Sequence, residues 1–211
     1  MSLNIGGTGI ARPFAKFNAK ADKWFVRGPD GEDAEIARPT FVIDLDNIAT
    51  GWVCFREGQA PERVMDQSLD QPAPSPGEGF KRGFVVMTFS PKFFGGAAEF
   101  ASASIHLSNA IKEIYAQYEA HKASNPGKLP VVACTGSEAM KDRYGTNYRP
   151  TLQIVQWVER PKDLPNQSPV DAADVWNGTN RSAAAATKMP AQHVPPPAPK
   201  PAAELLSEAV F

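Results

Sequence analysis

The chain has 211 residues, of which 42% are hydrophobic and 21% charged, and its 22 basic and 23 acidic residues give a formal net charge of −1. This composition is typical of a water-soluble folded domain with an appendage, and it argues against a fibrous, membrane-spanning or polybasic protein. If such a near-neutral chain binds a polyanion, its basic residues must gather on one face.

The first half of the chain predicts an arm followed by short strands. Residues 1–14 are rich in glycine and are expected to form a flexible arm. Apolar and aromatic runs at Lys23–Arg27, Pro39–Asp46 and Gly51–Phe55 predict strands of an antiparallel meander. Gln59–Gly79 holds four prolines and several acids, and it is expected to be a long loop.

The second half predicts one helix between strands. Gly83–Ser90 is apolar and is expected to be a buried strand, and Ala98–Lys122 shows helical periodicity. Leu129–Thr135 and Pro150–Glu159 predict two more strands, and the polar segment Thr135–Arg149 between them predicts a mobile loop. The apolar stripe of the helix consists of Leu107, Ile111, Ile114, Tyr115 and Tyr118.

Five or six short strands with one helix predict a mainly β, α+β fold. Hairpin-like spacing and a single covering helix favour an OB-like antiparallel barrel with one inserted helix, extending over residues 15–162. Residues 163–211 are expected to form a disordered Pro/Ala-rich tail, because Pro195–Pro201 alone contains five prolines.

Neither cysteine belongs to a metal-binding motif. Cys54 and Cys134 each lie inside an apolar stretch, and no ligand follows either of them at the spacing of a zinc site. We expect two buried free thiols, no metal and no cofactor.

The sequence shows no clear catalytic constellation. His106, His121 and His193 have no predictable orienting partner. Asp44 and Asp46 are two residues apart on a predicted strand, so both would point to one face and could bind a divalent cation. A metal-dependent nuclease is therefore one alternative, but a third carboxylate at a clear spacing is missing. We expect a protein that is not an enzyme.

Basic and aromatic residues alternate in four segments: Lys16–Arg27, Phe80–Phe84, Lys92–Phe94 and Lys141–Arg149. Proteins that bind single strands use aromatic rings to stack on bases and basic side chains to contact phosphates. Most aromatic residues of a β-rich domain nevertheless belong to its core. The residues predicted to contact nucleic acid are Lys23, Trp24, Lys81, Arg82, Lys141, Arg143, Tyr144, Tyr148 and Arg149.

The last ten residues, Ala202–Phe211, are apolar and mildly acidic and follow the proline-rich spacer. An apolar segment in a disordered tail is costly to keep in water unless a partner binds it. Leu206, Val210 and Phe211 are therefore predicted to dock on a partner protein.

This layout of an OB-like body, a proline-rich linker and a terminal Phe211 resembles phage and bacterial single-stranded DNA-binding proteins. The resemblance implies binding of single-stranded DNA in replication, recombination or repair, with partner proteins recruited by the tail. Those families carry a run of acidic residues before the last Phe, whereas this chain has only Glu204 and Glu208 there. Docking of a partner is thus favoured over competition with DNA.

The sequence therefore predicts a cytoplasmic, sequence-tolerant single-stranded DNA-binding protein of the phage type, without a membrane partner. Neither the oligomeric state nor the preference between DNA and RNA is decided, and a homo-oligomer fits this interpretation. The second alternative is an interaction or virion-accessory protein, which basic residues scattered around the body would favour.

Overall fold

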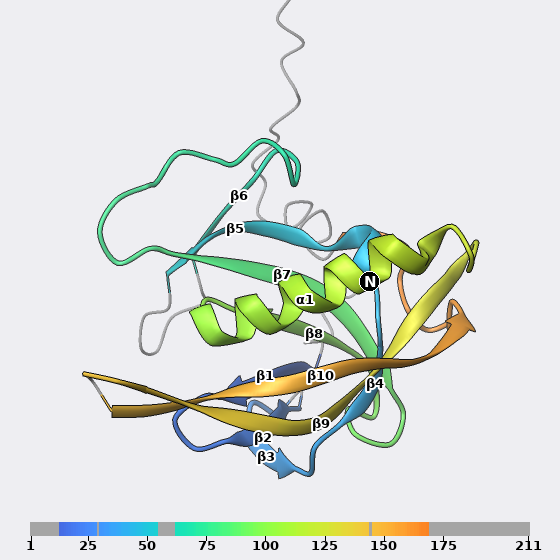
Figure 1. Cartoon of the computed structure of the whole chain (residues 1–211), viewed down its shortest axis with the longest axis horizontal. Helices are drawn as coiled ribbons and strands as arrows, with labels where there is room; N and C mark the ends of the chain where they lie inside the picture. Colours follow the sequence, from blue (N-terminus) through green and yellow to red (C-terminus); the bar gives the residue numbers. More distant parts are fainter. Residues whose placement is uncertain (1–12, 29, 55–61, 144, 169–211) are drawn as a thin grey trace, which may run out of the picture. The chain divides into compact units, whose positions relative to one another are not determined.

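The computed structural model describes residues 13–28, 30–54, 62–143 and 145–168. Within these ranges the chain forms ten strands, one α-helix and one short 3-10 helix (Figure 1). The strands are β1 (Phe14–Asn18), β2 (Lys23–Arg27), β3 (Asp33–Ile36), β4 (Thr40–Ile43), β5 (Ala49–Cys54), β6 (Glu62–Met65), β7 (Lys81–Ser90), β8 (Gly96–Ser102), β9 (Lys128–Asp142) and β10 (Gly145–Glu159). The helices are η1 (Leu45–Asn47) and α1 (Ile105–Lys122).

The strands form one mixed sheet in the order β10-β9-β4-β7-β8-β1-β2-β3. The long strand β7 pairs with β4 through its C-terminal half and with β5 through its N-terminal half, and β5 pairs in turn with β6. The pair β1 and β8 is parallel, whereas the other pairs are antiparallel. The mainly β expectation is confirmed, but the order of strands is that of an open sheet, not a closed barrel.

The core lies between the sheet and α1, which passes between β5 and β10 in the view of Figure 1. The predicted helical stripe is confirmed, since Leu107, Ile111, Ile114 and Tyr118 are all buried and Tyr115 packs beside them. On the sheet side the large buried side chains come mainly from alternate positions of the strands. These include Trp24, Phe41, Phe84 and Phe100. Both cysteines are buried and free, as expected.

The predicted start of the helix at Ala98 is wrong. Residues 98–102 belong to β8, in which Ala98 and Phe100 are fully buried and pair with β7. Alanine favours helices, and the run from Ala97 to Ala101 contains three of them, so its composition is that of a helical turn. Strand pairing outweighed that propensity, and α1 begins only after Ser104.

The predicted mobile loop Thr135–Arg149 is wrong as well. Most of this segment belongs to β9 and β10, which form an antiparallel hairpin of two 15-residue strands. The pairing runs from Lys128 opposite Glu159 to Asp142 opposite Gly145. The hairpin was missed because its polar residues lie outside the core, where no hydrophobic alternation marks a strand. Strands β1, β3 and β6 were missed because none of them has an apolar run longer than two residues, whereas the equally short β2 and β4 each have one of three.

Packing continues past the boundary expected at residue 162. Leu164 is 2% exposed and packs with Val42, Met87 and Leu129. The docking residues predicted in the tail, Leu206, Val210 and Phe211, lie outside the described residues, as does nearly all of the predicted N-terminal arm.

Candidate nucleic-acid interface

An open groove with a volume of about 940 Å³ lies where β1, the start of β7, the end of β8 and the start of α1 meet. Four basic residues line it, and among the described residues no aspartate or glutamate does so. The principal lining side chains are Phe14, Lys16, Lys20, Lys81, Arg82, His106 and Asn147. A chain with a net charge of −1 thus presents one concave surface whose formal charges are all positive.

The alternation of β1 provides one wall of the groove. Ala15 and Phe17 face the core, whereas Phe14, Lys16 and Asn18 are on the opposite side and are more exposed. The Asn18 side-chain oxygen then accepts hydrogen bonds from the backbone N–H groups of Lys20 and Ala21, at 3.0 and 3.3 Å. This local turn fixes the backbone position of Lys20 beside the groove.

A close approach of β7 to the end of β8 provides the other wall. A Cβ atom on Gly83 would lie 2.4 Å from the carbonyl oxygen of Ser102, a distance that no side chain tolerates. Glycine at this position therefore lets the two strands meet, and it brings Lys81 and Arg82 alongside the segment from Ser102 to Ser104.

The four basic side chains differ in their partners. Lys16 forms an ion pair with Asp33, and Arg82 forms one with Asp66. Lys20 and Lys81 are exposed and have no ion pair within the described ranges. A phosphate group would thus find two lysines whose charge is not neutralised by the protein.

Arg82 is held in place by a rigid set of contacts. Its two terminal nitrogens each donate to one oxygen of Asp66, both at 2.6 Å, and the guanidinium lies 5.4 Å from the centre of the Trp52 ring. The hydrogen bonds from Arg82 are the main cause that lowers the pKa of Asp66 to about 2, and Thr50 and the Ala73 N–H add to it. Two of the five N–H donors of Arg82 are used in this way, and three remain for another acceptor.

The start of α1 adds backbone donors to the groove. Ser104, Ile105 and His106 line it, and the first turn of this 18-residue helix contains no acidic residue. The first N–H groups of a helix lack intrahelical acceptors and carry partial positive charge. They add to the positive charge of Lys20 and Lys81.

The residues predicted from the sequence are only partly brought together here. Lys81 and Arg82 line the groove, whereas Lys23 pairs with Glu35 on the neighbouring strand β3. Trp24 was expected to be an exposed stacking ring, and this is wrong, because its side chain is 2% exposed and packs between Phe17 and Phe100. The alternation of β2 turns this ring into the core.

The predicted hairpin residues have mixed positions. Lys141 and Arg143 are exposed near the end of the β9–β10 hairpin, and Tyr144 lies outside the described residues. Tyr148 is half-buried against the core, and its backbone N–H donates to the carbonyl of Ala19 at 2.6 Å. Arg149 is bound to Glu113 of α1. The hairpin is thus anchored next to the groove through Tyr148, and its neighbour Asn147 lines the groove.

Phe14, Lys20 and His106 were not among the predicted contact residues, although all three line the groove. Lys20 belongs to the basic and aromatic segment Lys16–Arg27, so its composition gave a signal. Phe14 and His106 gave none, because only the parallel pairing of β1 with β8 brings them together.

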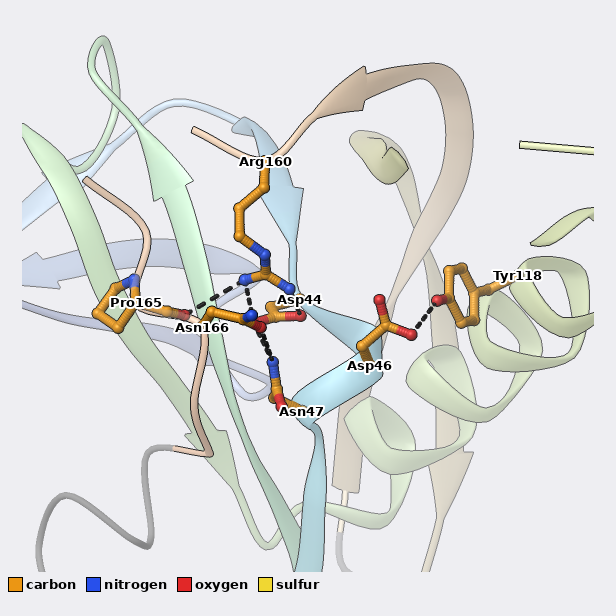
Figure 2. Close-up of polar contacts among 7 residues, drawn as sticks. All are labelled: Asp44, Asp46, Asn47, Tyr118, Arg160, Pro165 and Asn166. Carbon is orange, nitrogen blue, oxygen red and sulfur yellow. Dashed lines mark hydrogen bonds and ion pairs between the residues drawn. The ribbon is translucent and has the colours of Figure 1, made fainter. Parts of the chain in front are cut away.

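The two acidic residues considered for a metal site do not share a face. Strand β4 ends at Ile43, and Asp44 and Asp46 lie in the turn that leads into and through η1. Figure 2 shows Asp44 pointing toward Arg160 and Asp46 pointing toward Tyr118 of α1. The expected common orientation is wrong, because the chain leaves the extended conformation at this point.

Asp44 is fully buried and paired with Arg160, which follows β10. The two guanidinium nitrogens donate to its two oxygens at 2.6 and 2.8 Å. The side chain of Asn47 donates to Asp44 at 2.8 Å and to Asn166 at 3.3 Å (Figure 2). These contacts, here named the Asp44 latch, fasten the segment after β10 to the turn after β4.

Asp46 binds two groups on α1. The Tyr118 hydroxyl donates to one of its oxygens at 2.6 Å, and the Lys122 ammonium lies 2.9 Å from the same oxygen. Burial opposes the charge of Asp46, but these hydrogen bonds dominate and lower its pKa. Burial, together with the hydrogen bond to Asp46, raises the pKa of Tyr118 to about 12. The described residues contain no group of three or more His, Cys, Asp or Glu side chains arranged to hold a metal ion.

Comparison of the chain with protein-family models, with curated proteins and with solved structures found no match. None of the helices in the described part of the chain is both long enough and apolar enough to cross a membrane.

Proposed function

We propose that the chain binds single-stranded DNA along the groove, in a sequence-tolerant manner and without catalysis. The observation that carries this proposal is the groove's lining of four basic residues with no carboxylate among the described ones. Lys20 and Lys81 would contact phosphates directly, and the half-exposed ring of Phe14 offers a face for a base.

The β9–β10 hairpin lies beside the groove, because Asn147 of β10 belongs to the groove's lining. Lys141 and Arg143 near the hairpin end would then extend the contact beyond the groove. The proposal assigns the protein to DNA replication or recombination of the phage type, with Ala202–Phe211 recruiting a partner protein.

The test is fluorescence anisotropy with a labelled oligothymidine. We expect binding at low salt, with an affinity that falls as salt rises because condensed counterions are released from the strand. A labelled duplex of the same length is the comparison and is expected to bind more weakly, because its bases are not free to stack. Absence of oligothymidine binding at low salt, or binding that is indifferent to salt, contradicts the proposal and favours an interaction protein instead.

A further inference from the structure

A second, smaller cavity lies beside the groove, between α1 and the strands β5 and β7. Its volume is about 350 Å³, at the lower end of the roughly 300–1,000 Å³ of ordinary ligand pockets. The two cavities share Arg82 and Ile105 in their linings, so they are direct neighbours. The part of the groove lined by Arg82 and Ile105 therefore borders the second cavity.

The walls of the smaller cavity are mostly apolar and partly exposed. They include Ile48, Leu69, Phe84, Ile105, Ile111 and Tyr115. The described residues contain three exposed large hydrophobic side chains, and two of them, Leu69 at 45% and Ile105 at 62%, belong to this cavity. Exposed apolar side chains gathered around a hollow indicate a binding site more than scattered ones do.

Two polar groups of α1 in this lining lack partners. The Ser108 hydroxyl is buried and has no hydrogen-bond partner among the described residues, which is uncommon in folded proteins. Ser108 lines the smaller cavity, so a ligand with a polar edge placed there would give this hydroxyl a partner. One turn further along, Lys112 is exposed and forms no ion pair with any described residue.

We infer that this cavity accepts one nucleobase from a strand bound in the groove, an inference that rests on the proposed function. A base has apolar faces for Leu69 and Ile105, a polar edge for Ser108, and a phosphate within its own nucleotide for Lys112. A wholly apolar ligand would leave Ser108 and Lys112 without partners, and an inorganic anion would leave the apolar walls in water. A nucleotide matches both the apolar walls and the two polar groups. Arg82 belongs to the linings of both cavities.

The experiment compares two labelled oligomers of equal length on the full chain, oligothymidine and an abasic oligomer with the same phosphates. Wild-type protein is expected to bind oligothymidine at least 10-fold more tightly, because base contacts contribute beyond phosphate contacts. Leu69→Gln is expected to weaken oligothymidine binding 3- to 10-fold and to change binding of the abasic oligomer by less than 2-fold. Leucine and glutamine are both uncharged, so this substitution preserves the attraction of the protein for phosphates.

Val155→Gln is the matched control, because Val155 is 56% exposed and lies outside both cavities. It is expected to leave both affinities unchanged. Ser108→Ala is a second variant, expected to weaken oligothymidine binding about 3-fold while the melting temperature of the free protein stays equal or rises. If oligothymidine binding depends on salt but is weakened by neither Leu69→Gln nor Ser108→Ala, the inference of a base cavity is overturned. The proposed binding of DNA in the groove then still stands. Failure of the wild-type protein to bind either oligomer overturns the proposed function as well.

Discussion

Two charged regions of the molecule differ in how their charges are partnered. In the Asp44 latch, a fully buried carboxylate meets a guanidinium at two hydrogen bonds of 2.6 and 2.8 Å. In the groove, Lys20 and Lys81 face open space without a carboxylate in the described lining. A charge that the fold has already neutralised holds the structure together, whereas a charge left unpaired in a hollow is available to a ligand.

Breaking the latch gives the largest expected effect. Arg160→Ala leaves Asp44 buried without its counter-ion, and we expect the free energy of unfolding to fall by about 3–5 kcal/mol. Urea denaturation followed by circular dichroism measures this change. Arg27→Ala is the control, because Arg27 pairs with Asp33 at the surface and is half exposed, so its loss is expected to cost less than about 1 kcal/mol. Equal losses in the two variants would mean that the latch is an ordinary surface pair.

Reversing the unpaired charges of the groove is expected to change binding and leave the fold intact. Lys20→Glu combined with Lys81→Glu should weaken oligothymidine binding by about 30-fold or more at low salt, because two phosphate contacts become repulsive. Lys92→Glu combined with Lys128→Glu changes the net charge equally at exposed positions outside both cavities. Anisotropy titrations of both double variants distinguish local contacts in the groove from attraction by the net charge of the protein. Equal weakening in the two double variants would indicate attraction by net charge alone.

Asp66 forms a neutralised pair like that of the Asp44 latch, but its partner Arg82 lines the groove. Asp66→Asn is expected to lower the free energy of unfolding by about 1–2 kcal/mol, since a charge-assisted pair with Arg82 is lost. The same change leaves Arg82 more available to phosphate, so oligothymidine affinity is expected to rise about 2- to 5-fold. If this variant lost both stability and oligothymidine affinity, the pairing of Arg82 with Asp66 would not be what limits its availability to phosphate.

The same pair has a defined dependence on pH. The pKa of Asp66 is lowered to about 2 in the folded chain, so its stabilising contribution is complete above the ordinary carboxyl range and is lost as the pH falls through about 2. The stability difference between the wild-type protein and Asp66→Asn should therefore be constant above about pH 5 and shrink between about pH 4 and pH 2. Asp70→Asn, at an exposed loop position, serves as the control in these denaturation curves.

The smallest effect is expected at the contact between Asp46 and α1. Tyr118→Phe removes the hydrogen bond to Asp46 and should lower the free energy of unfolding by about 0.5–1.5 kcal/mol. Because the pKa of Tyr118 is raised to about 12, its hydroxyl should remain protonated at pH 11 in the folded chain. Ultraviolet difference spectra at pH 11 should therefore show the same phenolate absorbance for the wild-type protein and the variant, and a loss in the variant would contradict the contact.

Local patterns predicted the elements whose hydrophobic residues face one core. Lys23–Arg27 and Gly83–Ser90 were found as strands, and the stripe of α1 was found almost completely. Such elements carry their period in their own sequence. The extension of the β9–β10 hairpin was missed because its polar residues lie outside the core, where no hydrophobic alternation marks a strand. Strand β8 was misjudged because its state depends on pairing with β7 and β1 and not on its own propensity.

The candidate site was only partly predictable for a related reason. Lys81 and Arg82 were found because basic and aromatic residues alternate there, but the same criterion selected Trp24, whose ring the strand alternation directs into the core. The contribution of Phe14 and His106 depends on the parallel pair β1 and β8, and the latch joins residues 116 positions apart. Three-dimensional contacts of this range have no signature in composition or spacing.

The central claim is that a single strand lies in the groove, and photochemical crosslinking tests it most directly. An oligothymidine carrying 5-iododeoxyuridine at successive positions is bound to the full chain, irradiated, and the adducts are mapped by mass spectrometry. The proposal predicts adducts on Phe14 and His106, which both line the groove. Adducts confined to Phe25, Phe93 or Trp157, none of which lines the groove, would contradict it.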